Sequence, residues 1–179
     1  AEWVDPSEFP RPGDHPSRIL VGVSNGNIIY QTPIPKSVSA NEEAVKLYQF
    51  HVFFHEFFHT IDIPRRDPEK REAILLEYNG EQFTFQDFWD DFEKLCLRVD
   101  KKPVSKYAST YADQLSQATK MTDPDKFIRA VGEQIAEAFV GYILGILPND
   151  NSYVDFRKGH PEEYKLMDKI CKAKVLMTE

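Results

Sequence analysis

The sequence lacks several features that assign chains to common classes of protein. None of its apolar runs approaches the ~18 residues that a membrane-spanning helix needs, so no membrane span is predicted. Its 22 Lys and Arg residues are outnumbered by 29 Asp and Glu residues. Because these basic residues are scattered among acids and form no stripe, nucleic-acid binding is not expected. Internal repeats and low-complexity segments are also absent.

Cysteine is scarce as well. The two cysteines, Cys96 and Cys171, form no CxxC pair and lie far from the histidines in sequence. Such a pair is compatible with one disulfide in an oxidising compartment or with two buried thiols. We favour buried thiols because both residues fall on the apolar sides of predicted helices, and the sequence leaves the disulfide open.

The residues that are present indicate a globular chain. Of the 179 residues, 41% are hydrophobic and 28% are charged, which is sufficient for one domain with a real core. Residues 1–17 are rich in proline and charge, so we predict an irregular arm there and a single domain over residues 18–179. A small β element followed by four or five helices is expected, which is an α+β fold.

Local signals place most of these elements. Two β-branched runs around Asn25-Gly26 predict a hairpin, and Asn79-Gly80 predicts a second turn. A capping-box pattern from Ser39 to Glu42 predicts a helix that runs to about Ile61, and a short helix is expected within 65–78. Further helices are expected after Thr84, with an apolar face that reaches Val99, after Asp123-Pro124, and after Pro161. Residues 100–123 read as loop-like or only partly helical, and residues 147–160 as a polar linker.

The segment His55-Glu56-Phe57-Phe58-His59 matches the pattern HExxH. On a helix, residues four apart differ by about 40° in direction and ~6 Å in height, so both imidazoles can bind one Zn²⁺. Glu56 then lies beside the metal, where it can take a proton from a zinc-bound water. The alternative is a helix that happens to carry these residues. It is weaker, because a helix so rich in phenylalanine would bury an uncompensated carboxylate.

A third ligand is expected from another helix. His51 extends the row of histidines, but the row spans ~12 Å of helix, too far for three imidazoles to meet at one ion. Glu133 and Glu137 lie four residues apart among apolar residues. One can bind the metal while the other holds a ligand histidine. Taken alone, the pair is equally compatible with two solvated glutamates on an amphipathic helix.

HExxH followed much later by ExxAEAF, here Glu133 to Phe139, resembles the protease domain of anthrax lethal factor and related small secreted peptidases that cut proline-rich sequences. The resemblance covers roughly residues 40–175. It implies a zincin-like fold in which Glu133 is the zinc ligand and Glu137 supports a ligand histidine. Asp62 matches an acid that follows HExxH in these proteins and could orient His59 or His55. A helix cap or a surface acid is as compatible with Asp62.

The family also has a tyrosine, in a Ser-x-Tyr-Gly/Ala context, that hydrogen-bonds the oxyanion. Ser105-Lys-Tyr107-Ala108 matches that context, so the resemblance implies Tyr107 in this role. The spacing departs from the family, since the tyrosine usually lies only a few residues before the glutamate and 133 − 107 gives 26 here. Tyr111, in the same stretch, is the rival.

Together these patterns predict a zinc metalloendopeptidase that acts on a peptide or protein substrate, with Glu56 as general base. The alternative is a catalytically inactive, toxin-type docking module on the same fold. A deformylase-like hydrolase is disfavoured, because that class uses a cysteine ligand. The family is largely exported and the chain begins at Ala1, so secretion with a removed signal peptide is expected, although trimming would give the same start. A monomer is the default expectation.

Overall fold

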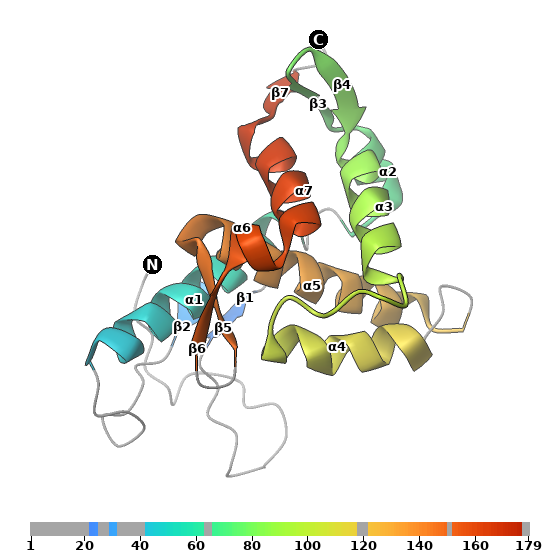
Figure 1. The fold of residues 1–179 in the computed structure, drawn as a ribbon. Coiled ribbons are helices and arrows are strands. Elements are labelled where there is room, and N and C mark those ends of the chain that lie inside the picture. The colour runs from blue at the N-terminus through green and yellow to red at the C-terminus, as the bar shows by residue number, and fades with distance from the viewer. Residues whose placement is uncertain are drawn as a thin grey trace. The chain divides into compact units, whose positions relative to one another are not determined.

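The computed structural model describes residues 22–24, 29–31, 42–62, 66–117, 122–149 and 152–176. These residues form helices and short antiparallel strands, with helix predominating (Figure 1), which confirms the mixed α+β class. None of the helices in these ranges is both long and apolar enough to cross a membrane. Two compact units are distinguished, residues 1–64 and 65–179. The arm predicted over 1–17 lies outside the described ranges, and the single domain over 18–179 stays a prediction.

The first unit contains a short hairpin. Strands β1 (Gly22–Ser24) and β2 (Ile29–Gln31) pair antiparallel, with Val23 opposite Tyr30. The predicted pair of strands is therefore confirmed, while its turn, residues 25–28, lies outside the described residues. Both strands contact the long helix that follows.

That helix, α1 (Glu42–Asp62), carries the HExxH segment. It ends one residue beyond the predicted end at Ile61, and the predicted cap at Ser39 lies outside the described residues. Its buried positions recur every three or four residues: His51, Val52, His55, Phe58, His59 and Asp62. The histidines therefore belong to the buried face of the helix. Phe57, by contrast, is 40% exposed.

The second unit begins with α2 (Pro68–Glu72) and a hairpin of β3 (Leu75–Tyr78) and β4 (Glu81–Thr84). At the turn, Asn79 and Gly80 have φ angles of 52° and 80°, as a two-residue type I′ turn requires. On its other side β3 pairs with β7 (Lys174–Leu176). The sequence predicts the turn but not these strands, because each is short and β7 lies near the other end of the chain.

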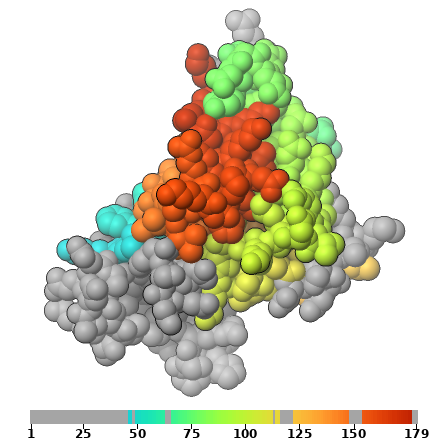
Figure 2. Space-filling view, in the orientation of Figure 1, coloured from blue at the N-terminus to red at the C-terminus, as the bar shows by residue number. Residues whose placement is uncertain are grey.

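Helix α3 (Phe85–Cys96) begins where it is predicted. Thr84 and Asp87 form a capping box, in which each backbone N–H donates to the other side chain, at 2.7 and 3.1 Å. The helix ends at Cys96, so the expectation that Val99 joins its apolar face is wrong, and Val99 is fully exposed. Helix α3 lies beside α7 (Pro161–Lys172), as Figure 2 shows.

Helices α4 (Lys106–Gln117) and α5 (Pro124–Leu144) pack against each other. The N-terminus of α5 is the predicted one, since the Asp123 side chain accepts a hydrogen bond from the Lys126 N–H at 3.2 Å. From Ala130 to Gly141 every residue of α5 is buried, so α5 is the core helix of this unit. Residues 100–123, expected to be at most partly helical, include all of α4.

The predicted polar linker over 147–160 is wrong. Strands β5 (Ile146–Asn149) and β6 (Ser152–Asp155) form a hairpin that leads into α6 (Phe156–Gly159). The segment is ordered by two apolar residues, since Leu147 and Phe156 are buried. Both pack at Gly141, where an added Cβ would lie 2.6 Å from the Phe156 ring. The predicted start of α7 at Pro161 is confirmed.

Both cysteines are free thiols, so the disulfide that the sequence left open does not form, but the favoured pair of buried thiols is not found either. Cys96 is half-buried, and burial raises the pKa of its thiol to about 12. Cys171 is exposed, so its expected place on an apolar helix side is wrong. A thiol with a raised pKa is poorly nucleophilic, because the protonated form is favoured.

Candidate metal centre

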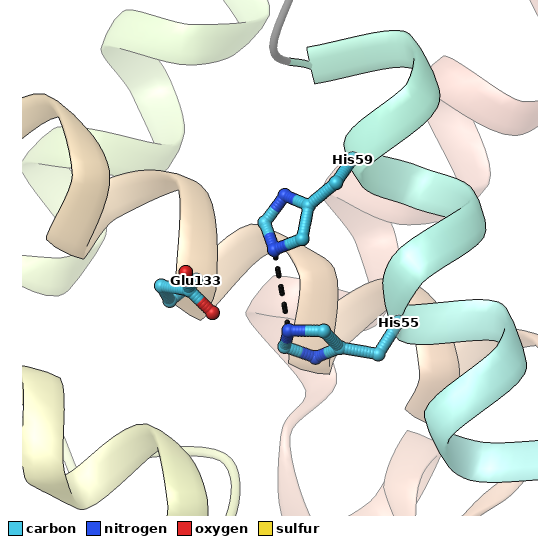
Figure 3. A group of neighbouring side chains, drawn as sticks. All are labelled: His55, His59 and Glu133. Carbon is cyan, nitrogen blue, oxygen red and sulfur yellow. Dashed lines mark hydrogen bonds between the residues drawn. The ribbon is translucent and has the colours of Figure 1, made fainter. Parts of the chain in front are cut away.

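The two motif histidines face each other one turn apart on α1. Their Nε2 atoms are 3.2 Å apart, and each residue is only 5% exposed (Figure 3). Two nitrogens bound to one tetrahedral Zn²⁺ at ~2.05 Å would be about 3.3 to 3.4 Å apart. The observed distance also suits a hydrogen bond between a protonated and an unprotonated nitrogen. The position of Asp62 is relevant to whether the two Nε2 atoms are arranged for a metal or for a hydrogen bond.

Asp62 lies at the end of α1 with no exposed surface, and its Oδ2 is 3.5 Å from Nδ1 of His59. A carboxylate beside Nδ1 favours the tautomer that carries its proton there, which leaves the Nε2 lone pair available to a metal. The structure therefore places Asp62 next to His59, one of the two histidines that the sequence proposed for it.

Glu133 projects from α5 and is 6% exposed. Two partners contact its carboxylate within the second unit. The Tyr107 hydroxyl donates to Oε2 at 3.4 Å, and the Arg129 Nε lies 3.8 Å from Oε1. Arg129 was not predicted, although its position four residues before Glu133 on a helix is the spacing of an ion pair.

His55, His59 and Glu133 form a group. Each offers one ligand atom, and these atoms all lie within 4.8 Å of one another (Figure 3). All three residues are buried. Two imidazoles and one carboxylate are a donor set that divalent transition metals bind. This group could therefore hold a metal ion.

Both candidate tyrosines lie on α4, one turn apart. Their hydroxyl groups are 3.0 Å apart, and only the Tyr107 hydroxyl is also hydrogen-bonded to Glu133. Tyr107 is 47% exposed, so its hydroxyl can reach a bound molecule. Tyr107 and Glu133 are 26 positions apart in sequence, and they meet because α4 packs alongside α5.

Glu137 is almost completely buried, one turn beyond Glu133. Its Oε2 accepts a hydrogen bond from the Ser105 hydroxyl. Sequence reasoning used Ser105 only as the context of Tyr107 and missed this contact, together with the one from the Gln134 amide to the Ala108 carbonyl oxygen at 2.6 Å. The serine of a Ser-x-Tyr pattern at the start of a helix was the available signal for a cap.

The remaining predicted residues lie on α1. Glu56 is half-buried and follows His55 directly in sequence. His51 is buried one turn before His55. It is not part of the group formed with Glu133, as expected from the length of the row.

Comparisons with known proteins add no relative: no family model, no curated protein and no solved structure matches this chain. The functional interpretation therefore depends on the site itself.

Proposed function

We propose that this protein is a zinc-dependent endopeptidase in which His55, His59 and Glu133 hold the metal. The observation that carries the proposal is the grouping of their three buried ligand atoms within 4.8 Å. The resemblance to the lethal factor protease domain supports the same three ligands. It also supports Glu137 as a supporting residue rather than a ligand.

Zinc is proposed on the chemistry of the donors. Three protein ligands of the His, His and Glu type are typical of catalytic zinc in peptidases, which keeps one position open. When bound, Zn²⁺ supplies Lewis acidity to a carbonyl and lowers the pKa of a bound water to about 7. All three proposed ligands are buried, so an ion bound by them would be largely shielded from water.

Glu56 is the proposed general base. It is carried by the same helix as both histidines, and the residue is half-buried. In this role it accepts a proton from the attacking water and then delivers the proton to the amine of the leaving peptide. Such a residue typically contributes a factor of about 10² to 10⁴ in rate.

Tyr107 is the proposed donor to the oxyanion that develops on the scissile carbonyl. Its hydroxyl lies at the carboxylate of Glu133, and nearly half of the residue is exposed. Tyr111 shares a hydrogen bond with Tyr107, but of the two hydroxyl groups it is that of Tyr107 that donates to Glu133, which favours Tyr107 over its rival.

The test is digestion of a peptide library with mass-spectrometric readout, alongside zinc analysis of each sample. Wild-type protein is expected to bind one zinc and to cleave. Glu56→Gln should retain zinc and lose at least about 100-fold in rate, whereas Glu69→Gln, at an exposed position on α2, should match wild type. Equal cleavage by wild type and Glu56→Gln would point to a contaminant. Zinc without cleavage would favour the docking module.

A further inference from the structure

We propose that Ser105 is a positioning residue. Together with Gln134, it holds α4 in register on α5 so that the Tyr107 hydroxyl lies at Glu133. This inference rests on the proposed function, because the role of the register is to present Tyr107 to the reacting carbonyl. All the contacts that carry it join residues of the second unit.

Ser105 uses its hydroxyl in two directions. The hydroxyl hydrogen is donated to Glu137 Oε2 on α5, and the oxygen accepts a hydrogen bond from the Ala108 N–H at 3.0 Å. The residue is 7% exposed. A hydroxyl has one hydrogen and two lone pairs, so one group both caps the first turn of α4 and joins that turn to α5.

Gln134 makes the second link. Its Nε2 donates to the Ala108 carbonyl oxygen at 2.6 Å, and Ala108 has no exposed surface. The two links meet α4 at residues 105 and 108, on either side of Tyr107, and meet α5 at residues 134 and 137, next to Glu133. A slip of one helical turn, ~5.4 Å, would break both links and carry the Tyr107 hydroxyl away from the carboxylate.

The hydrogen bonds of Ser105 and Gln134 are needed because chain connectivity does not set the distance between the Tyr107 hydroxyl and the Glu133 carboxylate. Tyr107 and Glu133 are 26 residues apart, and they belong to different helices. The phenol ring of Tyr107 is itself largely outside the core, at 47% exposure. Its position therefore depends on the backbone of the first turn of α4, which is the part that Ser105 and Gln134 fix.

The test compares Ser105→Ala with Ser105→Thr and Ser109→Ala. Ser109 is a matched control, since it is exposed on the same helix and its hydroxyl donates only within α4, to the Lys106 carbonyl oxygen at 2.6 Å. Ser105→Ala should lower kcat by about 10- to 100-fold with a smaller change in KM. Ser105→Thr, which keeps the hydroxyl, should recover most of the rate, and Ser109→Ala should match wild type.

A second readout needs neither metal nor substrate. In metal-free protein, backbone amides of residues 106–111 should exchange hydrogen faster in Ser105→Ala than in wild type or Ser109→Ala. A double-mutant cycle then separates positioning from general stability. On a Tyr107→Phe background, Ser105→Ala should cost little further rate, because the group that it positions is gone.

Unchanged kcat and unchanged exchange in Ser105→Ala would overturn the proposal, and so would a full, additive loss of rate on the Tyr107→Phe background. If Ser105→Ala does not fold, Gln134→Met is judged by the same three measurements. If wild type neither binds zinc nor cleaves, the proposed function fails. The exchange measurement still decides whether Ser105 holds α4 in place.

Discussion

Adding Zn²⁺ to metal-free protein is expected to raise its melting temperature by about 5 to 11 °C when free zinc is about 100 times the Kd. A ligand that binds only the folded state stabilises it by about 2.7 kcal/mol at that ratio. For chains of ~150 to 250 residues, each kcal/mol moves the melting temperature by roughly 2 to 4 °C, and this chain has 179 residues. The shift is expected only if His55, His59 and Glu133, the group that could hold a metal ion, bind the zinc in the folded state.

The same reasoning gives a value for ligand variants. If His55→Ala or Glu133→Gln weakens zinc binding by about 100-fold, the same zinc concentration only equals the new Kd. The stabilisation then falls to about 0.4 kcal/mol, or a shift of roughly 1 to 2 °C. His160→Ala removes a histidine that is not part of the group and should keep the full shift.

The assay is thermal unfolding followed by circular dichroism, on protein stripped with a chelator and titrated with Zn²⁺. The comparison is the zinc-induced shift of each variant, so differences in the melting temperature of the metal-free variants do not enter. An absent shift in wild type would refute the reasoning. Shifts in His55→Ala and Glu133→Gln as large as that of wild type would do the same.

Three further outcomes are expected. Tyr107→Phe should lower kcat by about 10² to 10³ in steady-state peptide cleavage while zinc affinity is kept; an unchanged kcat would remove Tyr107 from the mechanism. Gly141→Ala should destabilise the fold by about 1 to 3 kcal/mol in urea titration, because its Cβ would lie 2.6 Å from the Phe156 ring; equal stability would show that the ring moves freely. Burial raises the pKa of the Glu163 carboxyl, but contacts with His160 and Lys101 lower that pKa overall, below 4.5. The folded state therefore binds fewer protons than the unfolded state, and this stabilisation is present above pH ~4.5 and lost as pH falls through the folded pKa. The loss of stability between pH 6 and pH 3 should be smaller in Glu163→Gln, and an identical loss would contradict the assignment.

Much of the fold is predictable because its signals are local. Thr84 and Asp123 cap helices with their own side chains, and Asn79-Gly80 needs no distant partner to form its turn. Strand β7 was not predicted because its pairing partner, β3, lies far earlier in the chain. The 147–160 segment appears polar in sequence, and its order comes from Leu147 and Phe156 packing at Gly141.

The candidate site likewise has a part that is predictable from local sequence and a part that is not. The spacing of His55 and His59 follows from helix geometry, and the Glu133 and Glu137 pair follows from the same periodicity. The contact of Ser105 with Glu137, by contrast, joins residues 32 apart. No local pattern specifies which residue of one helix meets which residue of another, so this contact and the one from Gln134 could be found only in the structure.

The hydrogen bonds that join α4 to α5, from Ser105 to Glu137 and from Gln134 to Ala108, also affect how a site of this kind can vary between proteins. Because Tyr107 meets Glu133 sideways, across two packed helices, the segment that joins those helices can gain or lose residues without moving either side chain. A pattern search that demands a fixed gap between the tyrosine and glutamate motifs would overlook chains of this kind. A search that treats the gap as free, and instead requires the serine and glutamine that brace the helices, would retrieve them.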